Sequence, residues 1–298
     1  MPNWSKIEQN ISLSIGELFK LKKQSTVAGG DINQAYRISG MTDGNEPVSY
    51  FIKLNKKSRL DMFEAEAAGL EELERSQTIH VPKVICSSIE GDQSYLVLEN
   101  LSLTSGNSSS AKKFGQQLAA MHQQTASHFG WSRDNTIGST QQINTQTENW
   151  KDFLREFRFG YQFELAKRNA CAKSLQQKGE ELLNNFEAFF VDYQPKPSLL
   201  HGDLWSGNYA YLQNGEPVIF DPAVYYGDRE ADIAMTELFG GFSSEFYAAY
   251  NEVWPLDKGY KQRKTLYNLY HILNHFNLFG GGYAIQAENM TDQLLGFI

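Results

Sequence analysis

The spacing of apolar residues in the first part of the chain is that of short β-strands. Residues 25–101 contain alternating runs such as YFIKLN and SYLVLEN, and turns containing glycine separate these runs. Alternation with a period of two predicts half-buried strands. The run SRLDMFEAEAAGLEELERS instead has helical spacing, with Ser58 as the expected N-cap, and a further helix is predicted over about residues 5–20. We therefore expect a small lobe of strands with one helix inside it and one before it.

The later part of the chain has mainly helical spacing. Helices are predicted for AKKFGQQLAAMHQQ, TENWKDFLREFRFGYQFELAKRNA, about residues 174–192 and much of the chain beyond 230, and short strands for YAYLQ and PVIFD. The small polar stretch TSGNSSS at 104–110 is expected to be a loop or linker. The whole pattern predicts an α+β, bilobal fold, with a small β-rich lobe at 1–101 and a larger, mainly helical lobe at 102–298.

The composition is that of an ordinary globular protein, and it limits the possible partners. Hydrophobic residues make up 41% and charged residues 21%, and 27 basic against 35 acidic residues give a net charge of −8. An acidic chain without a strong Lys/Arg run predicts no nucleic-acid partner, and no apolar run is long enough for a membrane helix. Cys86 and Cys171 are too few for a disulfide framework, and the start MPNWSKIEQN lacks the pattern of a secretory signal. We therefore expect a cytoplasmic protein.

The stretch HGDLWSGN carries the clearest chemistry. It places His201, Asp203 and Asn208 at the spacing H-x-D-x-x-x-x-N, which is the catalytic-loop spacing of protein-kinase-like enzymes. One short loop can then aim a carboxylate at an attacking hydroxyl and an amide oxygen at a metal ion bound to the same phosphates. Gly202 and Gly207 allow a tight backbone there. A plain polar loop between strands is the alternative, but such a loop seldom has the full spacing.

Two earlier segments could bind the phosphates of a nucleotide. Gly29 and Gly30 lie in VAGGDINQ, where glycines would let backbone N–H groups approach a phosphate, although two glycines between strands are more often a simple turn. Lys53 lies on the predicted strand YFIKLN, either as an exposed edge lysine or paired with a carboxylate of the next helix. Glu66 is the first choice for that partner and Glu64 the second. A strand lysine with a helix glutamate is how kinases hold the α- and β-phosphates.

Asp221 supplies the last element of this arrangement. It ends the apolar strand VIFD, 13 residues after Asn208 (221 − 208 = 13), where a second magnesium ligand is needed. Mg²⁺ prefers one or two carboxylates together with phosphate oxygens and water. A single aspartate at the end of a strand is common, but all these segments in this order indicate a phosphotransferase that uses ATP and Mg²⁺.

The sequence resembles the fructosamine kinase, or ketosamine-3-kinase, family, which is an aminoglycoside-phosphotransferase-like branch of the protein-kinase-like fold. The resemblance covers nearly the whole chain and is most specific in HGDLWSGN and DPAVYYGDRE, with further similarity in FGWSRDNTIGSTQQ and LYNLYHILNHFNLFGG. It implies phosphorylation of the 3-hydroxyl of a sugar attached to an amine, as in fructosamines and ribulosamines. In this family that step destabilises the adduct and releases the amine.

The resemblance also implies roles for individual residues. Asp203 matches the catalytic aspartate, and Asn208 and Asp221 match the metal ligands. Asp232 matches an aspartate that braces the catalytic loop. The implied nucleotide-binding residues are Gly29, Gly30, Lys53, Glu66 and the hinge residues Glu99, Asn100 and Leu101, whose backbone would hold the adenine.

The acceptor site is less defined by the sequence. Sugars are bound by aromatic faces and hydrogen-bonding side chains, and five candidates lie close to the motifs: Trp205, Tyr225, Tyr226, Asp228 and Arg229. Trp131, Asn135 and Trp150 are further candidates. The two tyrosines could equally be core residues, and Arg229 could anchor a helix. His271 and His275 have a spacing that can bind metal, but packed histidines are the preferred interpretation.

Two alternative functions remain open at this point. One is a kinase of another small alcohol, such as an aminoglycoside or choline. The other is a silent pseudokinase that acts as a binding module, which the intact Lys53, Asp203, Asn208 and Asp221 disfavour. The sequence does not distinguish a free ketosamine from a glycated protein lysine as the partner. It does not determine the oligomeric state, for which a monomer is our working expectation.

Overall fold

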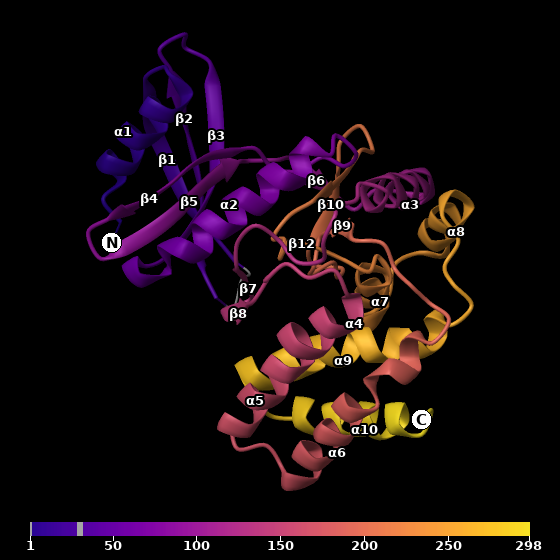
Figure 1. The fold of residues 1–298 in the computed structure, drawn as a ribbon. Coiled ribbons are helices and arrows are strands. Elements are labelled where there is room, and N and C mark those ends of the chain that lie inside the picture. Colours follow the sequence, from indigo (N-terminus) through magenta and orange to yellow (C-terminus); the bar gives the residue numbers. More distant parts are fainter. Residues whose placement is uncertain (1, 29–31) are drawn as a thin grey trace.

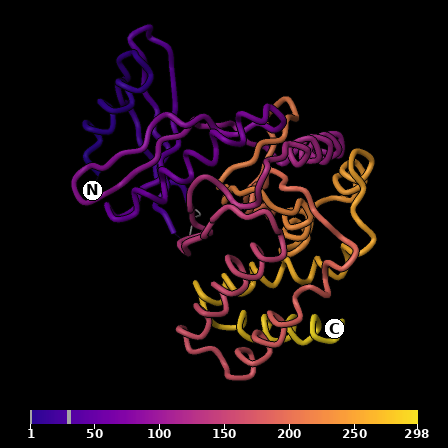
Figure 2. The backbone as a smooth tube through the Cα atoms, viewed as in Figure 1, coloured from indigo at the N-terminus to yellow at the C-terminus, as the bar shows by residue number. Residues whose placement is uncertain are grey.

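The computed structural model describes residues 2–28 and 32–298, which form two lobes (Figure 1). The first lobe is built on a sheet and the second mainly from helices, so the predicted α+β, bilobal architecture is confirmed. The first described residues and the C-terminus lie in different lobes (Figure 2). No helix of the described ranges combines the length and the apolar character needed to cross a membrane.

The N-terminal lobe contains a five-stranded antiparallel sheet with the order β1-β2-β3-β5-β4. The strands are β1 (Phe19–Val27), β2 (Gln34–Thr42), β3 (Pro47–Lys56), β4 (Val84–Glu90) and β5 (Gln93–Glu99). Alternation along β5 directs Tyr95 and Val97 to a core with α1 (Trp4–Ile15), whereas Leu96 and Leu98 join the core that contains α2 (Leu60–Arg75). Lys53 pairs with Leu96 across β3 and β5, which places it on the α2 face of the sheet.

The ends of the first two helices differ from the sequence prediction. The predicted helix over residues 5–20 ends at Ile15, because Gly16 adopts a left-handed C-cap with φ +75°. Leu18 is therefore exposed outside the helix, and β1 begins at Phe19. The expected N-cap at Ser58 is also wrong, since a 3-10 turn at Lys57–Arg59 precedes α2 and no side chain caps that helix.

The C-terminal lobe consists of helices around three small sheets. Its helices are α3 (Ser108–His122), α4 (Trp150–Phe153), α5 (Tyr161–Arg168), α6 (Lys173–Asn184), α7 (Glu230–Leu238), α8 (Ser244–Val253), α9 (Tyr260–Phe279) and α10 (Tyr283–Leu295), and a π-helix at Leu154–Gly160 joins α4 to α5. The stretch 104–110 is not entirely a linker, because α3 begins at Ser108 and the side chain of Asn107 caps it by accepting from the Ser110 N–H.

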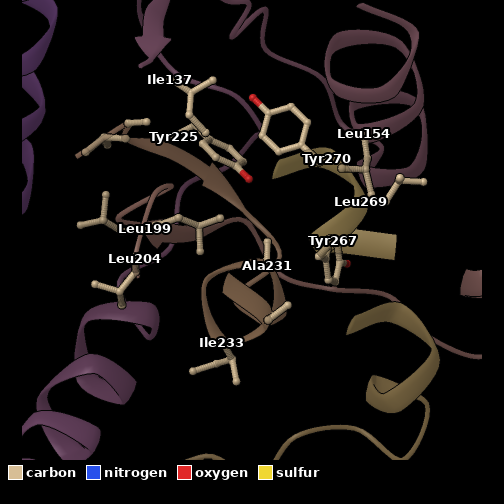
Figure 3. Packing of buried hydrophobic residues seen from close by; sticks show 14 of the residues in the cluster. Ile137, Leu154, Leu199, Leu204, Tyr225, Ala231, Ile233, Tyr267, Leu269 and Tyr270 are labelled. Atoms are coloured by element: carbon tan, nitrogen blue, oxygen red, sulfur yellow. The ribbon is translucent and has the colours of Figure 1, made fainter. Parts of the chain in front are cut away.

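The small sheets carry the segments that sequence analysis singled out. They pair β11 (Pro217–Ile219) with β10 (Tyr209–Leu212) and β6 (Leu103–Thr104), β12 (Tyr225–Gly227) with β9 (Ser198–Leu200), and β7 (Asn135–Ile137) with β8 (Thr140–Gln142). The HGDLWSGN loop connects β9 to β10, and Asp221 follows β11. A buried hydrophobic cluster that includes Leu199, Tyr225 and Leu269 lies under these strands (Figure 3). The loops that carry polar residues are thus mounted on a packed core.

Candidate active site

The tight backbone of the catalytic-loop motif depends on Gly202. This residue has φ +82°, and a Cβ built on it would lie only 2.1 Å from the carbonyl oxygen of Ala223. Ala223 in turn donates its N–H to the carbonyl oxygen of His201 at 2.8 Å. The loop therefore lies directly against the segment that follows Asp221, and only glycine fits at this contact.

Asn208 connects the two acidic residues of the motif. Its amide nitrogen lies 2.9 Å from the backbone oxygen of Asp203, 3.3 Å from the Asp203 carboxylate and 3.5 Å from the backbone oxygen of Asp221. The amide carbonyl of Asn208 is thereby turned away from Asp203. It is the kind of oxygen that a hard cation prefers.

His201 is a structural bridge in this loop. Its Nδ1 accepts from the Asp203 N–H at 3.2 Å, so Nε2 carries the proton and donates to the carbonyl oxygen of Phe220 at 3.0 Å. Burial lowers the pKa of His201, although Asp232 opposes the shift, and the ring is neutral. One imidazole thus fixes the loop of Asp203 relative to the strand end that carries Asp221.

Asp232, on α7, holds the other side of the loop. Its carboxylate accepts the N–H groups of His201 at 2.7 Å and Gly202 at 2.8 Å, and the ring of His122 lies 3.1 Å away. Burial would raise the pKa of Asp232, but the hydrogen bonds from His122 and the loop hold it below its ordinary value. Asp232 therefore braces the loop as a buried anion.

Lys53 lies between two carboxylates. Its Nζ is 2.6 Å from Glu66 Oε1 and 2.6 Å from Asp221 Oδ1, while Glu64 is exposed and makes no ion pair with it. Burial opposes the charge on Lys53, but Asp221 and Glu66 outweigh it and hold the pKa of Lys53 above its usual range. The ammonium thus links the sheet, α2 and the C-terminal lobe at one point.

Asp203 and Asp221 form an acidic pair. Burial, followed by the charges of Asp221 and Asp232, raises the pKa of Asp203 to about 7, against a smaller opposing effect of the Asn208 hydrogen bond. Such a pair favours a bound cation, and the donors beside it are carboxylate and amide oxygens, which suit Mg²⁺. The described residues contain no group of three or more His, Cys, Asp and Glu side chains arranged for a metal.

The expected hinge connects the two lobes. Glu99 ends β5, and Asn100 and Leu101 lie between β5 and β6. The side chain of Asn100 donates to Ser49 at 3.0 Å and accepts from Arg37 at 3.0 Å, which ties the connection to the N-terminal sheet. Gly29 and Gly30 lie outside the described residues.

The acceptor candidates fall into two groups. Trp205 is 37% exposed beside Asp203, with its ring covering Gly207 and meeting the edge of Phe239. Tyr226 is partly buried, and its hydroxyl donates to Glu72 of α2 at 2.7 Å. Of the five candidates next to the motif, only Trp205 has an exposed ring on the catalytic loop. The side chains of the other four are engaged in contacts within the protein.

Three of the five candidates are buried. Tyr225 belongs to the core (Figure 3). The guanidinium of Arg158 lies 4.3 Å from its ring centre. Asp228 accepts from Tyr267 at 2.5 Å and from Tyr193 at 2.9 Å. The guanidinium of Arg229 donates to the backbone oxygens of Trp254 at 3.0 Å and Pro255 at 2.5 Å and to the Tyr250 hydroxyl at 3.0 Å. The further candidates Trp131, Asn135 and Trp150 are buried as well.

Comparison with known proteins places this arrangement in a family. The family model described as fructosamine kinase matches residues 3–297. The chain belongs to the fructosamine kinase family. A Synechocystis protein named "Probable ketoamine kinase" is 51% identical over 98% of this chain and 97% of its own length. The chloroplastic protein-ribulosamine 3-kinase of Arabidopsis thaliana is 42% identical over 95% of this chain and 86% of its own length.

Solved structures agree with that family. A Haemophilus somnus protein assigned as a fructosamine-3-kinase has a TM-score of 0.88 at 30% identity, over 98% of this chain and 97% of that one. A choline kinase from Streptococcus pneumoniae has a TM-score of 0.62 at 15% identity, over 99% of both chains, and shares the fold. The kinase-like fold expected from the sequence is therefore confirmed for this member of the fructosamine kinase family.

The support for Asp232 extends to residues that sequence reasoning missed. The Tyr250 hydroxyl lies 2.8 Å from His122 Nδ1, and Arg229 donates to the same hydroxyl. A chain of hydrogen bonds thus runs from Arg229 through the Tyr250 hydroxyl and the His122 ring to the Asp232 carboxylate. Burial lowers the pKa of His122, which favours the neutral form of this ring. His122 and Tyr250 lie on α3 and α8, far from the motif in sequence, and no local pattern signals them.

The β7–β8 hairpin was also missed, although Gly138 between NTI and STQQ is a turn signal. Its base is held by Gln142, which donates to Asn135 at 2.8 Å and to the carbonyl oxygen of Ala223 at 3.1 Å. His271 and His275, which could have suggested a metal, are packed histidines. His271 is buried, and the ring of His275 lies among those of Phe239, Phe279 and Tyr283.

Proposed function

We propose that this chain is an ATP- and Mg²⁺-dependent kinase that phosphorylates the 3-hydroxyl of a ketosamine, a sugar joined to an amine. The observation that carries the proposal is the convergence of Lys53 from the N-terminal lobe with Asp221 and the Asp203–Asn208 loop from the C-terminal lobe. Family membership and the names of the relatives, ketoamine kinase and protein-ribulosamine 3-kinase, support the acceptor class.

The nucleotide would lie between the two lobes. Lys53, oriented by Glu66, would contact its phosphates, and the backbone of Glu99, Asn100 and Leu101 would hold the adenine. From the sequence, Gly29 and Gly30 would cover the phosphates. Asp221 and the amide oxygen of Asn208 would hold Mg²⁺, which when bound offsets negative charge on the phosphate oxygens.

Asp203 would act on the acceptor. Its carboxylate orients the sugar hydroxyl toward the γ-phosphorus and receives the hydroxyl proton. The new bond joins the sugar oxygen to phosphorus, the bond to the β,γ-bridging oxygen breaks, and ADP leaves. Most of the acceleration would come from positioning and from fixed charges, because phosphoryl transfer requires little covalent chemistry from the protein.

On the acceptor side, Trp205 is the candidate that we retain. Its exposed ring beside Asp203 could stack on the sugar or on the linked amine chain. Tyr225, Asp228 and Arg229 are assigned structural roles because their polar atoms or ring faces are engaged in protein contacts. Both a free ketosamine and a glycated protein lysine present the same sugar to this site, and phosphorylation would promote loss of the sugar from the amine.

Kinases of choline or aminoglycosides share only the fold at 12–15% identity, so they do not favour another acceptor. A silent pseudokinase is also disfavoured, because the side chains of Lys53, Asp203, Asn208 and Asp221 are all present.

Both Cys86 and Cys171 are free thiols, which supports a reducing compartment such as the cytoplasm.

The test is ADP release from Mg·ATP with and without ribulosyl-lysine or fructosyl-lysine. We expect ADP release that depends on the acceptor, and Asp203→Asn should lower kcat by at least about 100-fold with little change in ATP affinity. Asp192→Asn, at an exposed aspartate, is the matched control and should behave as wild type. Acceptor-independent turnover, or an Asp203→Asn variant with wild-type kcat, would refute the assignment.

A further inference from the structure

Helix α2 lies unusually close to the C-terminal lobe at Gly69. A Cβ built on Gly69 would be 3.2 Å from Val224 Cγ2 and 3.6 Å from Pro222 Cγ. These two residues belong to the short segment between Asp221 and β12. The helix that carries Glu66 therefore rests on the segment that begins at Asp221.

A hydrogen bond between the lobes lies one turn further along the same helix. The Tyr226 hydroxyl donates to Glu72 Oε1 at 2.7 Å, and Arg75 forms an ion pair with the other oxygen of Glu72. The side chain of Glu72 is only 19% exposed, so the bond is partly shielded from water. A hydrogen bond to a charged acceptor in such a setting is stronger than an exposed neutral one.

Tyr226 is a rigid donor. Its N–H donates to Gly130 O at 2.8 Å, its carbonyl oxygen accepts from Gly130 N–H at 2.9 Å, and it pairs with Leu199 in the β9–β12 sheet. Strand β9 on one side and an isolated bridge to Gly130 on the other thus fix its backbone. The position of the Tyr226 hydroxyl is therefore set by the C-terminal lobe. Its hydrogen bond then holds the Glu72 side chain, and with it this part of α2.

Glu72 and Tyr226 each lie close in the sequence to a carboxylate that holds Lys53. Glu72 lies six residues after Glu66 on α2 (72 − 66 = 6), and Tyr226 lies five residues after Asp221 (226 − 221 = 5). Glu66 and Asp221 are the two carboxylates that hold Lys53. We propose that Tyr226 and Glu72 are positioning residues that lock α2 onto the C-terminal lobe and so hold Glu66 and Lys53 ready for the nucleotide phosphates.

This inference rests on the proposed function and deepens it. It gives Tyr226 a role in nucleotide binding in place of the acceptor role expected from the sequence. Residues 222–225 are buried and lead directly into β12, so a packed segment connects Asp221 to the hydrogen bond between Tyr226 and Glu72. This hydrogen bond would then hold α2 in its binding position without a separate activation step.

The test measures the Kd of Mg·ATP by calorimetry and the acceptor KM by ADP release, together with amide hydrogen exchange of α2. Tyr226→Phe removes only the hydroxyl and should raise the Kd of Mg·ATP about 5-fold, speed exchange in α2 and leave the acceptor KM unchanged. Glu72→Ala should have the same effect. Glu72→Gln keeps an oxygen acceptor and should restore most of the affinity. The double variant Tyr226→Phe/Glu72→Ala should be no weaker than either single one.

Tyr260→Phe is the matched control, because the Tyr260 hydroxyl donates to Glu237 at 2.5 Å within the C-terminal lobe. It should lower the Tm without changing the Kd of Mg·ATP. A Tyr226→Phe variant that behaves in the same way, or one that raises only the acceptor KM, would overturn the inference and leave the proposed function intact. Failure of the wild type to bind Mg·ATP would overturn both.

Discussion

At the scale of single residues, Lys53 shows how a buried charge is stabilised. An isolated ammonium would be costly at a site where the residue is 6% exposed, and two carboxylates at 2.6 Å offset that cost. Its pairing with Glu66 could be predicted, because a strand and the following helix bring the two together. The contact with Asp221 could not be predicted from local patterns, because the two residues are 168 positions apart.

Replacement of this lysine gives a direct prediction. Lys53→Met should lower kcat/KM for ATP by about 100-fold, because it removes a cation from the phosphate site and leaves Glu66 and Asp221 without a counter-charge. Steady-state ADP release at varied ATP measures the effect. Lys20→Met removes an exposed lysine on β1 and serves as the control. Equal values for the two variants would show that Lys53 does not contact the nucleotide.

Residue identity alone did not indicate which polar side chains near the motif are free. Asp228 and Arg229 follow the motif closely, yet their partners Tyr267 and Trp254 belong to much later segments. Burial of this kind depends on tertiary packing. Trp205 keeps an exposed face because its ring lies over Gly207 on the loop itself, which is a local property of the motif.

At the scale of elements, the loop between β9 and β10 depends on its contact with the segment after Asp221. Gly202→Ala should lower kcat by at least about 100-fold and destabilise the fold by about 3 kcal/mol, because its Cβ would overlap the oxygen of Ala223. ADP release and urea unfolding measure these effects.

Gly16→Ala separates this overlap from backbone strain. Gly16 has a similar positive φ of +75°, but a Cβ there would meet no heavy atom of the described residues within 4 Å. This variant should lose about 1 kcal/mol and keep its activity. Should Gly202→Ala behave like Gly16→Ala, the close packing of the loop would not matter for catalysis.

Element types could be predicted from the sequence more reliably than element boundaries. The strands around Gly91, the helix that carries Glu66 and the two short strands after HGDLWSGN follow from periodicity and turn residues, whereas β9 before that motif was not predicted. The π-helix at Leu154–Gly160 interrupts what looks like one continuous helix in the sequence. It carries Arg158, which is fully buried and donates to Asn144 at 2.7 Å. A tertiary contact of this kind leaves no periodic signal.

At the scale of the whole molecule, buried histidines predict how stability depends on pH. Burial lowers the pKa of His122, His201 and His271, and that of His271 falls to about 3. These rings stay neutral in the folded state but take up protons in the unfolded chain below about pH 6.5. For these three groups the unfolded state then binds more protons, so their contribution to the free energy of unfolding should fall as the pH drops from about 7.5 to 5.5. Asp203 and Glu230 contribute in the opposite direction, because burial raises the pKa of each carboxyl to about 7 and the folded state binds their protons.

Urea unfolding across that range measures the slope, and a single substitution isolates one contribution. Nδ1 of His271 is buried and has no hydrogen-bond partner among the described residues, so His271→Leu should be tolerated at pH 7.5. It should also reduce the slope by about 1.4 kcal/mol per pH unit below pH 6. An unchanged slope would mean that His271 is protonated in the folded protein or that the unfolded state does not gain its proton.

The central claim is that the two lobes together direct the γ-phosphate of ATP to one hydroxyl of a ketosamine. The most direct measurement is the position of the phosphate in the product, by tandem mass spectrometry and phosphorus–proton NMR, after incubation of the full chain with Mg·ATP and ribulosyl-lysine or fructosyl-lysine. The account predicts one added phosphate on the 3-hydroxyl, absent with Asp203→Asn, followed by release of free lysine. Phosphate at another position, or an unmodified ketosamine with ATP bound, would contradict it.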